Sequence, residues 1–213
     1  MKNSTRNGRR NDELRPVSAT REYKTAGEGA VMFAMGETRV LCAASVSRMV
    51  PDHAAGRGWG WITAEYTMLP YSTSPRTERR VLRPDGRAVE IQRLVGRSLR
   101  SVADLSKLDG YAITVDRDVM KADGGTRTAA ITGGFIALRM AVDGLLAGGG
   151  LALDPLQGSV AAVSAGLVDG KTLLDLDYSE DSRASVDMNI VMDDRFNFIE
   201  VQGTGEKCSF SRK

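Results

Sequence analysis

The segment over residues 127–146 most constrains the fold, because it is apolar on most sides of a helix. A helix of that kind is stable only when it is buried in a protein core or a membrane. It ends at Gly148, Gly149 and Gly150, and glycines in this place are typical of helix C-termini. No apolar run reaches the length of a transmembrane span. We therefore expect a core helix that other elements must cover.

A second helix is predicted over residues 88–107 from apolar residues at spacings of three and four. These residues are Ile91, Leu94, Val95, Leu99, Val102 and Leu105. Short apolar or alternating runs, bounded by turn residues, predict strands on either side of the two helices. The runs cover residues 31–35, 39–46, 59–69, 111–120, 160–168, 172–177, 185–192 and 196–202. This order of elements predicts an α+β fold with mixed sheets and two main helices.

Length and composition limit the class of protein. With 213 residues and 42% hydrophobic residues, the chain can bury a core, so we expect one domain over residues 14–213 behind a mobile polar tail over residues 1–13. Cys42 and Cys208 are too few for a disulfide framework or a zinc site. The charged start of the chain has no apolar run after it, so we expect no signal peptide and a soluble cytoplasmic protein without a membrane partner.

Charge is unevenly distributed, although the net charge is only +2. Residues 1–24 hold seven bases and three acids, and residues 71–87 hold five arginines and two acids. Residues 172–206 hold nine acids and two bases. A basic end and an acidic end in one chain are typical of a polyanion partner beside a metal or acid site.

The sharpest local motif is Ala-Asp-Gly-Gly-Thr-Arg-Thr at residues 122–128, between a predicted strand and the core helix. Glycines let backbone N–H groups approach an anion, and a helix N-terminus favours negative charge. Thr126 adds a hydroxyl, and Arg127 adds a guanidinium that can bind two oxygens. The motif predicts a phosphate site. The alternative is an ordinary helix cap in which Asp123 or Thr126 satisfies the helix end.

An acidic stretch near the end of the chain contains a possible magnesium site, because magnesium prefers one or two carboxylates together with phosphate oxygens. Asp187 stands in the apolar run 186–192, where an unpaired charge is costly unless a cation or metal joins it. Asp181 precedes it across a predicted turn, so the two carboxylates can converge. For Asp175 and Asp177, a solvated or structural role is the better interpretation.

Arginines are the third group of candidates. Those of the predicted loop over residues 71–87 can follow a nucleic-acid backbone, and those of the first helix share its polar face, although a solvated surface is the alternative for both sets. The two sets are Arg76, Arg79, Arg80, Arg83 and Arg87, and Arg93, Arg97 and Arg100. His53 is the single histidine and has no recognisable Ser or Cys partner, so a hydrolase triad is not expected.

A series of long blocks joins these motifs. The blocks are residues 11–17, 38–42, 58–66, 86–87, 90–100, 116–128, 174–176, 180–182, 186–189 and 199–206. They include Asn-Asp-Glu-Leu-Arg-Pro-Val, Gly-Trp-Gly-Trp-Ile-Thr-Ala-Glu-Tyr and the glycine motif described above. Together they resemble the ribonuclease PH family, from about Asp12 to Arg212.

The resemblance implies a phosphate-dependent 3′→5′ exoribonuclease that trims the 3′ ends of tRNA precursors and other RNAs. Inorganic phosphate is the co-substrate, and a nucleoside diphosphate is the product. The family pattern assigns phosphate binding to Gly125, Thr126, Arg127 and Arg87. It assigns magnesium binding and protonation of the leaving oxygen to Asp181 and Asp187. The candidates for RNA binding are Arg76, Arg79, Arg80, Arg93 and Arg97.

The resemblance also implies a fold and an assembly. The fold is a βαβα unit like domain 2 of ribosomal protein S5, and the assembly is a homo-hexamer built as a trimer of dimers. Three departures from the family pattern are the lack of a C-terminal helix, Tyr71 where members often have Arg, and Lys121 in place of Gln. The alternative function is a non-catalytic RNA-binding ring subunit. A kinase-like phosphate binder is disfavoured, because no glycine-rich nucleotide loop is found.

Overall fold

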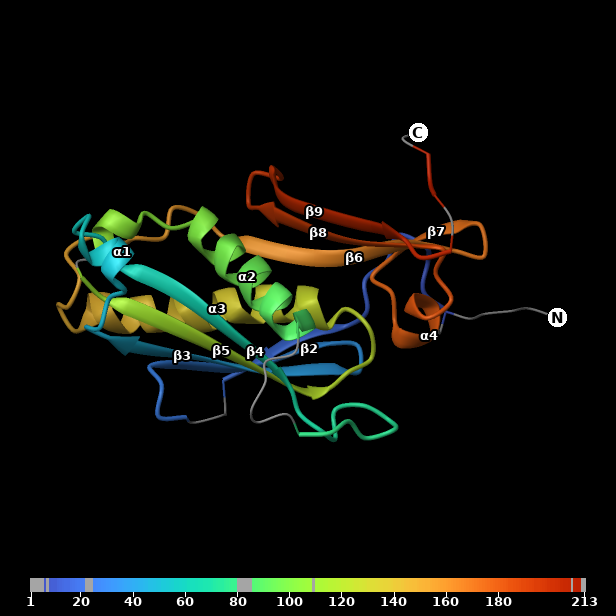
Figure 1. The fold of residues 1–213 in the computed structure, drawn as a ribbon, viewed down its shortest axis with the longest axis horizontal. Helices are drawn as coiled ribbons and strands as arrows, with labels where there is room; N and C mark the ends of the chain where they lie inside the picture. The colour runs from blue at the N-terminus through green and yellow to red at the C-terminus, as the bar shows by residue number, and fades with distance from the viewer. Residues whose placement is uncertain are drawn as a thin grey trace.

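Two sheets enclose one long helix in the computed structural model of the chain (Figure 1). The structure describes residues 6, 8–21, 25–79, 86–108, 110–207 and 209–211. The main apolar core draws residues from both sheets and from the helices. The α+β class and the mixed sheets predicted from the sequence are therefore confirmed.

The first sheet has five strands in the order β1-β2-β3-β5-β4. These strands are β1 (Val17–Thr20), β2 (Gly29–Met35), β3 (Thr38–Ser47), β4 (Trp61–Met68) and β5 (Ala112–Lys121). All neighbours are antiparallel except β4 and β5, which are parallel. Parallel neighbours need a crossover connection, and helix α2 (Gly86–Ser101) lies within it.

The second sheet has four antiparallel strands in the order β7-β6-β8-β9. These are β6 (Val160–Val168), β7 (Lys171–Leu174), β8 (Val186–Asp193) and β9 (Phe198–Gly205). Between β7 and β8 lies the short helix α4 (Tyr178–Asp181), which the sequence did not predict. Two other short helices are α1 (Asp52–Ala55) and the 3₁₀ helix η1 (Leu105–Leu108).

The core helix α3 (Thr126–Ala147) lies between the two sheets, as its apolar sequence predicted (Figure 1). It packs on β2, β3 and β5 of the first sheet and on β6 and β8 of the second. Its length and composition would also suit a membrane span, so the prediction that no apolar run reaches that length was wrong. Packing against both sheets explains why this helix is apolar on most sides.

Two predictions of element ends were wrong. The first helix ends at Ser101 rather than at residue 107, because the chain turns there and Ala103 pairs with Leu156. The helical spacing of apolar residues continues past Ser101 because the 3₁₀ helix that follows also packs on the core, and this extended the predicted helix too far. The strand β7 ends at Leu174 rather than at residue 177, since Asp175 has a φ of 55°. A positive φ does not fit a strand.

The segment predicted as a mobile tail, residues 1–13, contacts the folded domain in its described part, although residues 10–13 are exposed. Arg6 is buried and forms an ion pair with Glu180, with Nε and Oε1 2.7 Å apart. The backbone of Asn11 accepts a hydrogen bond from Leu174 at 2.8 Å. At the other end, no helix follows β9 among the described residues.

Candidate functional site

A cleft of about 710 Å³ lies where the first turn of α3 faces α4 and β8. It brings together all of the residues predicted to bind phosphate and magnesium. These residues are Arg87, Gly125, Thr126, Arg127, Asp181 and Asp187. They come from both halves of the chain, so the cleft forms only in the folded protein.

The phosphate loop, residues 122–126, forms one wall of the cleft. Gly124 and Gly125 both have left-handed backbones, with φ of 72° and 64°. The N-cap of α3 is Gly125, and in the described chain no side chain caps this end. The prediction of an ordinary cap by Asp123 or Thr126 is therefore wrong. The N–H groups of the first helical turn have no partner within the helix and are available to an anion.

Arg127 extends the positive charge of this wall. Its Nη2 lies 3.2 Å from Oε2 of Glu90 on α2, which holds one end of the guanidinium. Its Nε is buried and has no hydrogen-bond partner in the described residues. A buried, unpartnered donor on a cation is costly unless a ligand accepts its hydrogen bond. An anion in the cleft would supply that acceptor. Arg87, at the start of α2, adds a second guanidinium.

The side chain of Thr126 is oriented by Tyr66 of β4, whose hydroxyl donates a hydrogen bond to Thr126 Oγ1 at 3.1 Å. Burial raises the pKa of Tyr66, so this phenol keeps its proton and remains a donor. The Thr126 hydroxyl has one proton, and with its oxygen already accepting from Tyr66, that proton is available to a ligand.

The acidic wall faces the phosphate loop and holds Asp181 at the end of α4 and Asp187 on β8. Burial raises the pKa of Asp181, against the opposing positive charges of Arg87 and Arg127. Burial also raises the pKa of Asp187, and the negative charge of Asp181 raises it further. A half-buried carboxyl whose ionisation is disfavoured by a neighbouring carboxylate is a suitable place for a proton or a cation.

The acidic pair suits magnesium chemically, because this ion uses one or two carboxylates, waters and substrate phosphate oxygens. In the described chain, no group of three or more Asp, Glu, His or Cys side chains forms a complete metal cage. Asp181 and Asp187 would therefore hold magnesium only together with substrate oxygens and water.

Comparisons with known proteins agree with this geometry. Residues 13–142 match the model for domain 1 of the 3′ exoribonuclease family, RNase PH, and residues 158–213 match the model for its domain 2. The chain belongs to the ribonuclease PH family. The two matches correspond to the two sheets of the fold.

Solved structures show the same fold at low sequence identity. An Archaeoglobus fulgidus exosome chain, from a structure with RNA bound to the active site, has a TM-score of 0.82 and 24% identity over 97% of this chain and 84% of its own. Rice Rrp46 has a TM-score of 0.75 and 21% identity over 93% and 84% of the two chains. A chain of an archaeal exosome core has a TM-score of 0.73 and 23% identity over 97% and 81%.

Four of the five arginines predicted to bind RNA lie in the described part of the chain, and none of these four lines the cleft. Arg76 and Arg79 are exposed on the loop after β4, and Arg93 is exposed on α2. Arg97 is held by Glu200 of β9 through hydrogen bonds of 2.6 and 2.7 Å. Arg80 lies outside the described residues. Any contact between the four described arginines and RNA would therefore be made outside the cleft.

Several residues of the cleft were missed by sequence reasoning. Thr73 and Ser74 line it from the loop after β4, and Tyr178, Glu206 and Lys207 line it from the acidic side. No periodic or glycine-rich pattern marks Thr73, Ser74, Tyr178 or Lys207. Glu206 follows Gly203 and Gly205 in the block over residues 199–206, which supported only the resemblance to the family. Arg15 was also missed, although it stands in the Leu-Arg-Pro block that supported the resemblance to the family.

Proposed function

We propose that the protein is a phosphate-dependent 3′→5′ exoribonuclease that trims the 3′ ends of tRNA precursors. One observation carries the proposal. A cleft of the ribonuclease PH fold places the unpartnered Nε of Arg127 and the uncapped start of α3 opposite two carboxyls with raised pKa values. This is the arrangement that transfer of a nucleotidyl group to inorganic phosphate requires.

The positive wall would hold inorganic phosphate as the nucleophile. Arg127, Arg87, the Thr126 hydroxyl and the N–H groups of the α3 start would fix its oxygens. One phosphate oxygen then attacks the phosphorus of the last phosphodiester bond of the RNA. Positioning and electrostatic stabilisation supply most of the catalysis in phosphoryl transfer, so no Ser, Cys or His nucleophile is needed.

The acidic wall would act on the leaving group. Breaking the bond between phosphorus and the 3′ oxygen releases a shortened RNA and a nucleoside diphosphate. The 3′ oxygen needs a proton, and a raised pKa favours the protonated form of a carboxyl that could donate one. Asp187 suits this role because both burial and Asp181 raise its pKa. Magnesium, when bound with these carboxylates, would neutralise charge on the phosphate oxygens.

We also propose that the chain assembles with copies of itself into a ring, as a trimer of dimers. Strand β9 stands at the edge of the second sheet and exposes Phe198 and Val201. An exposed strand edge with apolar side chains is a typical site of association. Light scattering at micromolar concentration tests this, and a monomer would contradict it.

The decisive experiment supplies an RNA with an unpaired 3′ tail, with and without phosphate. The proposal predicts nucleoside diphosphates only when phosphate is present. Arg127→Ala should reduce the rate by about 10²–10³-fold, because it removes a charged contact made in the transition state. Equal shortening without phosphate, with monophosphates as products, would refute phosphorolysis.

A second candidate is a ring subunit that binds RNA without cleaving it. The structural similarity to exosome chains favours this candidate. The same assay separates the two functions. A purified oligomer that retains RNA but releases no nucleotide at saturating phosphate and magnesium would support the ring subunit and refute the enzyme.

A further inference from the structure

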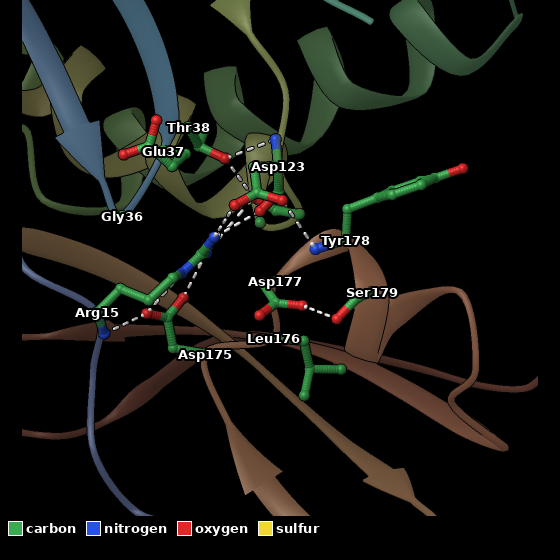
Figure 2. A network of polar contacts seen from close by, with 12 residues as sticks. Arg15, Gly36, Glu37, Thr38, Asp123, Asp175, Leu176, Asp177, Tyr178 and Ser179 are labelled. Atoms are coloured by element: carbon green, nitrogen blue, oxygen red, sulfur yellow. Dashed lines mark hydrogen bonds and ion pairs between the residues drawn. The ribbon is translucent and has the colours of Figure 1, made fainter. Parts of the chain in front are cut away.

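The phosphate loop is held from behind by side chains that do not face the cleft. Arg15 lies on the segment before β1, is 5% exposed, and donates through Nη1 to the backbone carbonyl of Asp123. Its Nη2 donates to the carbonyl of Gly124 at 3.4 Å. Figure 2 shows its guanidinium between the loop and Asp175.

Thr38, the first residue of β3, holds the same two loop residues. Its buried hydroxyl donates to the carbonyl of Gly124 at 2.7 Å, and its oxygen accepts from the N–H of Asp123 at 3.0 Å (Figure 2). Consecutive carbonyls held on one side of a chain direct the N–H groups of the next residues toward the other side. In this loop the other side is the cleft.

Arg15 also binds the half of the molecule that carries the acidic wall. Asp175 is completely buried and accepts from the backbone N, the Nε and the Nη2 of Arg15 at 2.7, 3.0 and 2.6 Å. Asp175 follows β7 directly and precedes α4, which ends at Asp181. A second contact joins the phosphate loop to α4, because the N–H of Tyr178 donates to Asp123 Oδ1 at 3.4 Å.

We propose that Thr38 and Arg15 are positioning residues of the phosphate site: Thr38 orients the loop toward the anion, and Arg15 fixes the loop against the acidic wall through Asp175. This role rests on the proposed function, because it concerns the same phosphate. Neither residue lines the cleft. Thr38 acts on one wall alone, whereas Arg15 joins the two walls, so their variants should have different kinetic effects.

The test is the substitution Thr38→Val, which keeps the side-chain shape and removes both hydrogen bonds. Thr132 offers a matched control on α3, because its hydroxyl donates to the carbonyl of Thr128 at 3.2 Å and accepts from the N–H of Ala162 at 3.1 Å. Thr132→Val therefore removes the same two kinds of bond at a distance from the loop. If Thr38 only stabilises the fold and does not position the loop, Thr38→Val and Thr132→Val should have similar phosphate KM values.

Two measurements are made on each full-length variant, namely the KM for phosphate and the rise in melting temperature that phosphate produces. Thr38→Val should raise the phosphate KM by about fivefold, the scale of one or two lost net hydrogen bonds, and leave kcat at saturating phosphate within about twofold. The phosphate concentration that gives half of the maximal rise in melting temperature should increase by the same factor. Thr132→Val should leave both values unchanged.

Arg15→Lys should lower kcat as well as raise the phosphate KM. A lysine keeps the charge but cannot reach Asp175 and both carbonyls at once, so the two walls lose their fixed spacing. If Thr38→Val has the same phosphate KM and the same phosphate-dependent rise in melting temperature as the parent, the positioning role is refuted. The proposed function would not be affected by that result. A parent protein that phosphate neither stabilises nor activates would refute the proposed function and this role together.

Discussion

The substitution Gly124→Ala tests how closely the two walls of the cleft approach each other. A Cβ atom at Gly124 would lie 2.5 Å from the carbonyl oxygen of Leu176 and 2.7 Å from the carbonyl carbon of Asp177. These are backbone atoms of the segment before α4, and they cannot rotate away as a side chain can. The new methyl group must therefore push the phosphate loop away from the acidic wall.

The expected loss of stability has two parts. Alanine at the left-handed φ of 72° costs about 1–2 kcal/mol. Overpacking against fixed atoms costs about a further 1–3 kcal/mol, which gives a total of about 2–5 kcal/mol. Gly149→Ala is the control, since Gly149 has a φ of 71° and no atom within 4 Å of its added Cβ. Gly149→Ala should show only the cost of placing alanine in a left-handed backbone.

Urea denaturation of the two variants measures the difference, and RNA phosphorolysis measures its effect on function. We expect Gly124→Ala to be less stable than Gly149→Ala by about 1–3 kcal/mol, the packing part alone. It should also be less active at temperatures where both variants are folded, because the displaced loop separates Arg127 from Asp181. If the two variants have equal stability and activity, the close approach of the two walls is not a constraint, and the reasoning is refuted.

Two further predictions concern single side chains. Asp187→Asn should abolish most activity, yet in the absence of magnesium it should unfold at a higher temperature than the parent at pH 7. Because the folded protein raises the pKa of Asp187, the protonated carboxyl favours folding. This contribution to stability is complete at pH below the pKa in the unfolded chain and is lost as the pH rises through the pKa in the folded protein. The advantage of Asn should therefore disappear as the pH falls below about 4, and melting curves between pH 3 and 8 check this. Arg97→Ala removes an ion pair with Glu200 in which Arg97 is 53% exposed, so it should cost less than about 1 kcal/mol. A lower RNA affinity with unchanged phosphate KM, measured at low salt, would assign Arg97 to RNA binding, and an unchanged affinity would exclude it.

Local sequence signals predicted much of the fold. The apolar helix over residues 127–146 was found within one residue at each end, because its burial against two sheets determines nearly every position. The strands predicted over residues 160–168 and 172–177 were also found, as the antiparallel pair β6 and β7, although β7 ends early. Errors occurred where long-range contacts decide the structure, as at the end of β7, where Asp175 leaves the strand to bind Arg15.

The candidate site was predictable only in part for the same reason. Glycines before an apolar helix are a local signal, so residues 124–127 could be assigned from the sequence. Asp187 could be noticed because it interrupts an apolar run. Arg15 could not be found in this way, since its partners are 108 to 160 positions away in the chain. An arginine before a proline has no pattern that distinguishes a buried ion pair from a solvated charge.

Two charged residues of the cleft carry an energetic cost in the fold without a ligand. Arg127 leaves a buried donor without an acceptor, and burial and the charge of Asp181 both disfavour the ionised form of Asp187 by raising its pKa. The contacts that offset these costs lie behind the cleft, in the buried pair of Arg15 and Asp175. A bound anion beside a proton or cation would relieve the unpaired charges of both walls at once. Ligand binding should therefore stabilise the whole fold.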